Sequence, residues 1–114
     1  MMPKHPQLPL HEPTFFILLS LAHTKKHGYA ILKNVESLSN GKIQLSNGTL
    51  YGVLSRLQQQ GMIERVETIT AERNGRGKKE YKLTADGLKL LNAESERLQQ
   101  MLDAAKLCLL GAEG

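Results

Sequence analysis

The sequence contains one cysteine and no tryptophan in 114 residues, and it has only two phenylalanines and three tyrosines. A lone thiol excludes an intrachain disulfide and a zinc site built from several cysteines, and it fits a reducing, cytoplasmic setting. No apolar run comes near the ~20 residues that span a bilayer. The first residues show no basic segment followed by an apolar stretch, so we expect neither a secretory signal nor a membrane partner. The length suits one compact domain.

Positive charge is concentrated in the first three-quarters of the chain, and the formal net charge is +4. Residues 1–84 carry 12 Lys and Arg against 6 Asp and Glu, whereas residues 85–114 carry 3 against 5. A basic body joined to a mildly acidic tail indicates a polyanionic partner for the body and a different role for the tail. Ordinary solubilising charge is the alternative explanation.

Apolar periodicity and capping residues predict three short helices, a β-hairpin and a long last helix. Ser46 is a good N-cap for the third helix, Gly61 is a natural stop for it, and Thr84 caps the last helix. The expected elements are helices over 13–24, 29–38 and 47–60, strands over 62–69 and 80–83, and a helix over 85–110. This order describes a winged helix-turn-helix, in an α+β class that is mostly α. The expected units are an N-terminal arm over 1–12, a winged helix-turn-helix domain over 13–84 and a C-terminal dimerisation helix over 85–114.

The last predicted helix carries an apolar seam with a seven-residue repeat. Leucines dominate two series that lie three residues apart, as the a and d positions of a coiled coil do. The seam residues are Leu88, Ser95, Leu102 and Leu109 in one series, and Leu91, Leu98 and Ala105 in the other. A helix of ~26 residues spans ~39 Å, which is longer than the small body that it would have to cover. We therefore expect the five seam leucines to form a two-fold dimer.

The predicted helix over 47–60 has two chemically different faces. One is an apolar stripe, formed by Leu50, Val53, Leu54 and Leu57. The other is small, hydrogen-bonding and free of acids, and it comprises Gly48, Tyr51, Gly52, Ser55 and Gln59, with Thr49 and Arg56 at its flanks. A major groove about 12 Å wide admits such a helix, and the N–H groups at a helix start favour phosphate oxygens. The second face therefore predicts DNA contact, although Tyr51 could instead fill a gap against the preceding helix.

A basic tip is predicted between the two strands. Four basic residues lie close to two glycines in this segment; they are Arg73, Arg76, Lys78 and Lys79, around Gly75 and Gly77. The cations would neutralise phosphates, and the glycines would let the tip approach a backbone or a narrow groove closely. Alone, this pattern also describes a solvated loop. Beside an acid-free helix face, it favours a second contact to DNA.

Other candidate residues give weaker signals. His23 and His27 are four residues apart, as in a metal pair, but no third ligand is in view, and histidines at a helix end commonly interact with its dipole instead. Cys108 flanks the seam as a small apolar residue, with a redox role as the less favoured alternative. Tyr29 and Tyr81 are expected in the core. No nucleophile–base pair, phosphate loop or metal motif is present, so we expect no enzyme, no metal and no cofactor.

Four blocks of the sequence resemble the PadR family of transcriptional regulators. They are His27-Gly28-Tyr29-Ala30-Ile31, the run from Ser46 to Leu57, Gly61-Met62-Ile63, and the run from Tyr81 to Gly87. Their order and spacing match the family over about residues 14–90. The resemblance implies a winged-helix DNA-binding domain, a dimer built through the C-terminal helix, and repression relieved by a small ligand or signal. The residues it places at DNA are Ser46, Thr49, Tyr51, Ser55 and Arg56 on the helix, and Arg76, Lys78 and Lys79 on the wing.

The chain also departs from the family pattern. It has a single C-terminal helix and so resembles the short subclass. Asn47 stands where a proline is common, and Glu80 stands where a second aromatic or basic residue is frequent. The absence of tryptophan excludes an indole sandwich for flat aromatic ligands at the dimer interface.

The sequence therefore predicts a homodimeric, sequence-specific regulator of double-stranded DNA in the cytoplasm, acting as a repressor. A small-molecule effector, if one binds, is expected in the dimer cleft between the first and last helices. The alternative is a winged-helix adaptor that binds another protein and no DNA. Such adaptors usually expose apolar or acidic residues on the recognition helix, and this helix exposes neither.

Overall fold

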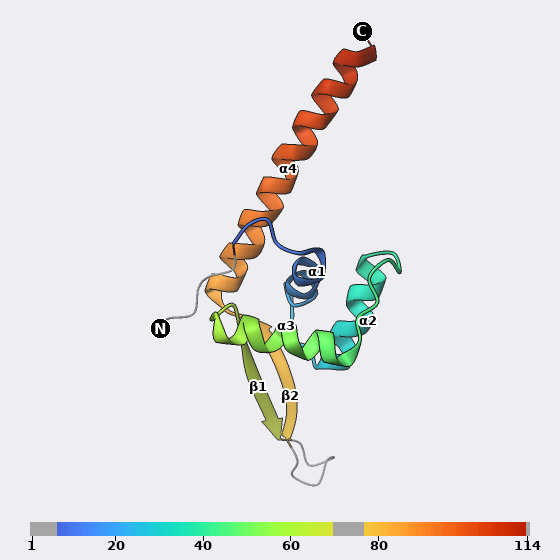
Figure 1. Cartoon of the computed structure of the whole chain (residues 1–114). Coiled ribbons are helices and arrows are strands. Elements are labelled where there is room, and N and C mark those ends of the chain that lie inside the picture. The colour runs from blue at the N-terminus through green and yellow to red at the C-terminus, as the bar shows by residue number, and fades with distance from the viewer. Residues whose placement is uncertain (1–6, 70–76, 114) are drawn as a thin grey trace.

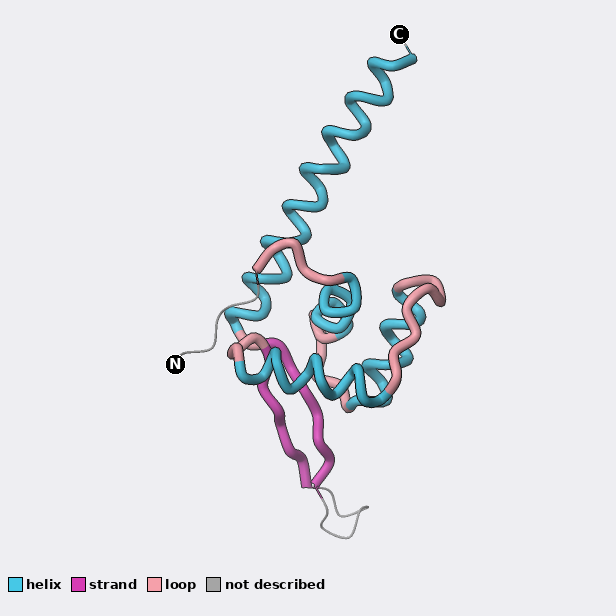
Figure 2. The backbone as a smooth tube through the Cα atoms, in the orientation of Figure 1, coloured by secondary structure: helices cyan, strands magenta, loops and turns pink. Residues whose placement is uncertain are grey.

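The computed structural model describes residues 7–69 and 77–113 of the chain. Its elements in chain order are α1 (Glu12–Ser20), α2 (Gly28–Leu38), α3 (Asn47–Gln59), β1 (Ile63–Ile69), β2 (Gly77–Leu83) and α4 (Ala85–Glu113). The three short helices form a body, the β1–β2 hairpin leaves that body on one side, and α4 projects from it on the opposite side (Figure 1). Figure 2 shows the same arrangement by type of secondary structure. This is the mostly helical winged helix-turn-helix that the sequence predicts.

The core forms where the apolar stripes of the short helices meet the start of β1 and the start of α4. From α3, Leu50, Leu54 and Leu57 are each at most 1% exposed, and from α1, Ile17 and Leu18 are fully buried. The other core members include Ile31, Val35, Met62, Ile63, Tyr81 and Leu91. The predicted stripe of α3 is thus the face that holds the helix against the body.

The start and the end of α3 have the causes that the sequence indicates. The hydroxyl of Ser46 accepts a hydrogen bond from the Thr49 amide at 3.1 Å. Gly61 follows the helix at a φ of 78°, in the left-handed region that suits glycine. The position of the recognition helix along the chain is therefore fixed by residues that the sequence alone identifies.

The first helix is shorter than predicted. A helix was expected over 13–24, but α1 ends at Ser20, after which the Leu21 amide donates to the Leu18 carbonyl in a tighter turn. Leu21 is only 2% exposed, so the apolar pattern continues into the core beyond the end of the helix. Apolar periodicity alone does not distinguish a helix that continues from a buried turn that follows the end of a helix.

The shorter helix changes the interpretation of the two histidines. His23 lies in the turn after α1, and His27 begins α2, where its Nδ1 accepts from the Ala30 amide at 3.3 Å. The two side chains do not share a helix, so the spacing argument for a metal pair and the dipole alternative both fail. Within residues 7–69 and 77–113, no cluster of three metal-ligating side chains occurs.

The hairpin is longer than predicted, and its β2 strand is paired on both edges near the base. β1 and β2 pair antiparallel from Ile63 opposite Leu83 to Ile69 opposite Gly77. Lys26, between α1 and α2, adds a bridge that the sequence did not signal: its amide donates to the Tyr81 carbonyl at 3.0 Å, and the Tyr81 amide donates back at 2.8 Å. Because the amide and the carbonyl of Tyr81 both bond to Lys26 and its side chain is only 6% exposed, the base of the hairpin is attached to the body.

The hairpin and α4 meet in a tight junction. The Thr84 hydroxyl accepts from the Gly87 amide at 3.0 Å and donates to the Gly61 carbonyl at 2.6 Å. A Cβ on Gly87 would collide with the carbonyl group of Met62, so only glycine fits there. The family-like blocks at 61–63 and 81–87 thus contact each other and set the angle at which α4 leaves the body.

Only the first turns of α4 pack on the body. Leu91 is 4% exposed and belongs to the core of its own chain, so it is not available to a partner helix, contrary to the prediction. One turn later, Glu94 is 2% exposed and accepts hydrogen bonds from the Leu10 amide at 2.8 Å and from the Arg97 guanidinium. The segment before α1 is therefore anchored to α4. No helix in the described part of the chain is long and apolar enough to cross a membrane.

Candidate nucleic-acid interface

The recognition helix and the hairpin share one side of the molecule. α3 runs across the body beside the base of the hairpin, and α4 extends away from both (Figure 1). A linear polyanion laid along α3 would therefore meet the hairpin and would not meet the projecting part of α4.

The N-terminal turn of α3 presents one free hydroxyl donor. The Ser46 hydroxyl is used twice, because it accepts from the Thr49 amide and donates to the Thr49 hydroxyl oxygen at 3.0 Å. The Thr49 hydroxyl keeps its own hydrogen for an external acceptor, and both residues are exposed. Of the two predicted contacts, Thr49 is thus the better donor to a phosphate or a base, and Ser46 positions it.

Two glycines make the exposed face of α3 flat. A Cβ placed on Gly48 or on Gly52 would meet no other atom within 4 Å, so nothing in the described chain requires glycine at either position. Glycine inside a helix costs about 1 kcal/mol of stability relative to alanine. The two glycines let another molecule approach the helix backbone closely, which is what insertion into a groove demands.

Tyr51 lies between the exposed face and the start of α2. It is 49% exposed, and its hydroxyl and Cζ atom lie over Gly28, where an added Cβ would sit 2.9 Å from Cζ. Burial raises the pKa of the neighbouring Tyr81 phenol, the Tyr51 hydroxyl adds to the rise, and Arg65 opposes it. Both predicted roles of Tyr51 are therefore compatible with its position: one edge of the ring packs on α2 and the other faces outward.

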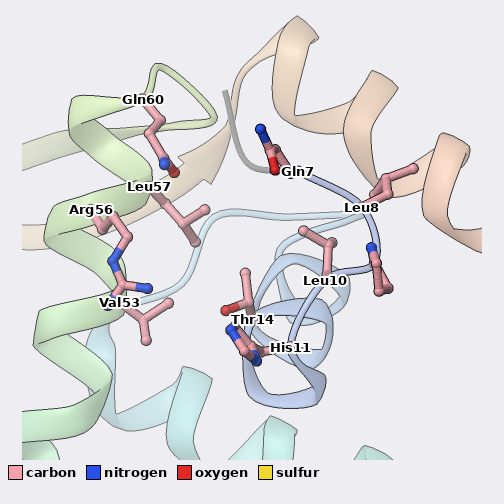
Figure 3. Close-up of a pocket in the computed structure, with 10 residues that line it drawn as sticks. Gln7, Leu8, Leu10, His11, Thr14, Val53, Arg56, Leu57 and Gln60 are labelled. Atoms are coloured by element: carbon pink, nitrogen blue, oxygen red, sulfur yellow. The ribbon is translucent and has the colours of Figure 1, made fainter. Parts of the chain in front are cut away.

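Ser55 and Arg56 complete the predicted helix residues. Both are exposed, and Ser55 lies one turn beyond Tyr51 on the same side of α3. Arg56 lies at the flank, where its guanidinium extends toward the segment before α1 (Figure 3). Asn47–Gln59 contains no carboxylate, so no acid on α3 would repel a phosphate.

In the described part of the hairpin, two lysines lie opposite acidic residues. Lys79 is exposed, but its register partner across the hairpin is Glu67, and Lys82 is paired with Glu64 at 3.2 Å. Arg73 and Arg76 lie outside the described residues, as does the side chain of Lys78. Their contact with DNA stays a prediction.

One surface group was missed by the sequence interpretation. Tyr29 was expected in the core, but it is 64% exposed, and the Nζ of Lys33 lies 5.6 Å from its ring centroid. The stripe of α2 is set by Ile31 and Val35, and a position two residues before Ile31 falls on the opposite side of the helix. The helical wheel therefore held the signal that would have placed Tyr29 outside.

The predicted dimer residues are placed as follows. Apart from Leu91, the four remaining seam leucines are exposed in the single chain: Leu88 at 46%, Leu98 at 39%, Leu102 at 48% and Leu109 at 67%. Met101, at 57%, extends the same stripe and was missed because it falls outside the strict seven-residue series. Cys108 is also exposed.

Comparisons with known proteins agree with this geometry. The model of the transcriptional regulator PadR-like family matches residues 17–93. The transcriptional regulator YqjI of Escherichia coli strain K12 is 33% identical over 96 residues, which cover 84% of this chain and 44% of the relative. The chain thus spans less than half the length of the curated relative that it matches.

Solved structures show the same fold. A PadR family transcription regulator from Clostridium difficile R20291 superposes with a TM-score of 0.71 at 21% identity, covering 87% of this chain and 99% of that one. Bacillus subtilis PadR in complex with operator DNA superposes with a TM-score of 0.61 at 25% identity, covering 70% of this chain and 44% of that one.

Proposed function

This chain belongs to the transcriptional regulator PadR-like family, and from that membership and the geometry above we propose that it acts as a homodimeric, sequence-specific regulator of double-stranded DNA. The family is one of regulators and not of enzymes. The proposal places the protein in the cytoplasm with its DNA.

The observation that carries the proposal is the exposed face of α3. It is free of carboxylates, flattened by Gly48 and Gly52, and supplied with hydrogen-bond donors at Thr49 and Ser55. The alternative of a protein-binding adaptor would need an apolar or acidic face, and α3 offers neither. The operator complex of Bacillus subtilis PadR supports the same use of this fold.

Within the proposal, the residues divide by role. Thr49, Tyr51 and Ser55 would read base edges, because they lie on the face that enters the groove. Ser46 would hold the first turn, and Arg56, Arg76, Lys78 and Lys79 would neutralise phosphates and so position the protein without reading sequence.

The dimer is proposed on the exposed stripe of α4. Leu98, Leu102 and Leu109 are each at least 39% exposed, because no other segment of the described chain packs on them. In a dimer whose two-fold axis runs along α4, the α4 helix of the second copy would cover this stripe. The same arrangement would place two copies of α3 on one side of a duplex.

Repression and relief by a small ligand are the finer part of the proposal, and they follow from the resemblance to the family. The expected place for an effector is the cleft of the dimer. In the single chain, a hollow of about 360 Å³ lies between the turn after α1 and the junction of β2 with α4, with Leu21 and Leu88 in its wall, and it is the place that we propose for this site.

A salt titration tests the proposal. Fluorescence anisotropy of the full chain with labelled duplexes should show binding at 50 mM salt, with the logarithm of the affinity falling by about 0.9 per neutralised phosphate for each unit of log salt. The double variant Arg76→Ala/Lys78→Ala should weaken binding to all duplexes alike and reduce the slope by about two. Ser55→Ala should change the preference among duplexes instead.

Lys89→Ala is the matched control, since Lys89 is exposed on α4 and faces away from α3 and the hairpin. Its salt slope should equal that of the parent. Absence of duplex binding at 50 mM salt, together with salt-insensitive association with a protein, would support the adaptor instead. Unchanged binding by the double variant would contradict the assignment of the wing.

A further inference from the structure

A cleft at the flank of the proposed DNA surface, and outside the proposed dimer surface, lies between α3 and the segment that precedes α1. It has a volume of about 390 Å³, which falls within the range of roughly 300–1,000 Å³ that is typical of small-molecule sites. Figure 3 shows that residues 7–14 form one wall and the last two turns of α3 form the other. The first wall is fixed, because the Leu10 amide is bonded to the buried Glu94 of α4.

The cleft contains a hydroxyl that the described residues leave without a hydrogen-bond partner, although its oxygen is still accessible to solvent. Thr14 is 9% exposed, and in the described part of the protein no group donates to its hydroxyl or accepts from it. In Figure 3 this hydroxyl points from α1 toward α3, into the cleft. Because water can reach it, this hydroxyl does not carry the desolvation cost of a buried group that lacks a partner, and it is free to donate a hydrogen bond to a polar group bound in the cleft.

The charge in the cleft is positive and unopposed. Arg56 lines it, and no carboxylate of the described residues pairs with that guanidinium. His11 stands at the N-cap of α1 but makes no capping hydrogen bond through its side chain. None of the ten residues that line the cleft is acidic. A planar guanidinium suits a carboxylate, which it can bind through two parallel hydrogen bonds.

The apolar part of the remaining lining is aliphatic, and Gln7 and Gln60 add two amide groups. The apolar part consists of Leu8, Pro9, Leu10, Val53 and Leu57, and neither a phenylalanine nor a tyrosine of the described chain lines the cleft. A flat aromatic ligand would find only the small imidazole of His11 to stack on, whereas a flexible or branched hydrocarbon body can fill a surface of leucine and valine side chains.

We propose that this cleft is a binding site for a small aliphatic carboxylate. The carboxylate lies against Arg56, accepts a hydrogen bond from the Thr14 hydroxyl, and leaves its hydrocarbon body on Leu10, Val53 and Leu57.

Binding at this site has a consequence that rests on the proposed function. Arg56 stands at the flank of the recognition face, so a carboxylate that holds its guanidinium removes one cation from the phosphates of a duplex. The occupied protein therefore binds DNA more weakly than the empty protein does.

The test is a titration of the ¹⁵N-labelled full chain with sodium hexanoate, followed by amide chemical shifts at constant ionic strength and without DNA. Saturable shifts are expected at Thr14, Val53 and Arg56 and not at Lys89. Arg56→Gln, at an exposed position that tolerates the change, should weaken the affinity about tenfold or more, because a hydrogen bond to a charged group is lost. Thr14→Val should weaken it less, and Arg65→Gln, the control at another exposed arginine, should leave it unchanged.

Related probes separate the parts of the proposal. Acetate lacks the body and hexylamine reverses the charge, so both should bind at least about tenfold more weakly than hexanoate. No saturable shifts with hexanoate, equal affinity in Arg56→Gln, or tighter binding of benzoate than of hexanoate would each overturn the assignment. A duplex titration without hexanoate tests DNA binding separately, so failure of one proposal is distinguishable from failure of the other.

Discussion

Gly28 and Tyr51 are matched to each other at the contact between α2 and α3. The ring of Tyr51 occupies the space where a side chain on Gly28 would begin. Gly28 does not have a positive φ, so it is required for space and not for an unusual backbone conformation. This pair sets how far the tyrosine projects from the recognition face.

Gly28→Ala should therefore displace Tyr51 and lower the free energy of unfolding by about 1–3 kcal/mol, the usual cost of overpacking. Tyr51→Phe in the same chain removes the hydroxyl that is nearest to the new methyl group and should recover part of the loss. Urea unfolding of the two single variants and the double variant measures the coupling. Strictly additive effects would mean that the two residues do not compete for this space.

Glu94 makes the stability of the protein dependent on pH. Hydrogen bonding to Arg97 holds the pKa of this buried carboxyl below its ordinary value of 4.5, burial opposes this, and the bond from the Leu10 amide adds to it. A lowered pKa in the folded state contributes stability above the unfolded value, and that stability is lost as the pH falls through the folded pKa.

Glu94→Gln should consequently be less stable than the parent at pH 7, and the difference should shrink as the pH falls below about 4.5. Urea midpoints between pH 7 and pH 2.5 provide the measurement. Glu96→Gln, at an exposed position two residues on, should follow the parent at every pH. A constant difference between Glu94→Gln and the parent across this range would show that the charge of Glu94 plays no part.

Single residues also show where sequence interpretation stops. Tyr81 lies in the core as predicted. Tyr29 was also predicted there but is exposed, because its position on the helical wheel lies opposite the apolar stripe of α2. Leu91 satisfies the seven-residue repeat and still packs on its own body, since periodicity identifies the apolar face and not the partner that covers it. The bond between Leu10 and Glu94 joins residues 84 positions apart, and no local pattern announces such a contact.

At the scale of the element, α3 gives up helix stability for a flat surface. Gly52→Ala should raise the free energy of unfolding by up to about 1 kcal/mol, because an added methyl group meets no atom within 4 Å and alanine favours the helix. The same methyl group should weaken duplex binding by roughly tenfold, since it stands on the face that approaches the DNA.

Gly111→Ala is the matched control for that prediction. Gly111 also lies in a helix with open space around a new Cβ, but it stands near the end of α4, far along the chain from the recognition face. The Gly111→Ala variant should be more stable than the parent and should bind duplexes with the same affinity. Equal duplex affinity for Gly52→Ala and the parent would contradict the close approach of α3 to DNA.

The order of the elements was predictable and their exact extents were not. Caps at Ser46 and Thr84 and the stop at Gly61 are local chemistry, so the limits of α3 and the start of α4 follow from the sequence. The length of β2 and the bridge through Lys26 depend on pairing between distant segments. They could be seen only when the chain was folded.

At the scale of the whole molecule, the single chain is extended, because much of α4 lies outside the body. Its radius of gyration is 17.0 Å, against about 13 Å for a compact chain of this length. Its extents of 67 × 36 × 23 Å reflect the part of α4 that leaves the body with its leucines exposed. An amphipathic helix in this state requires a partner for its apolar stripe.

Leu102→Glu should therefore yield a monomer where the parent is a dimer, because a carboxylate in the centre of the stripe would be buried without a counter-charge. Gln100→Glu places the same charge on the opposite side of α4 and should leave the dimer intact. Analytical ultracentrifugation at micromolar concentration distinguishes the two outcomes. A parent chain that sediments as a monomer would rule out the dimer on α4.

The central claim is that two acid-free copies of α3, joined through α4, bind one duplex. Selection of duplexes from a random pool with the purified full chain at low salt tests it most directly. The account predicts enrichment of paired, inverted half-sites about one helical turn apart, at 10–10.5 base pairs from centre to centre. A pool that stays random after repeated selection would contradict it.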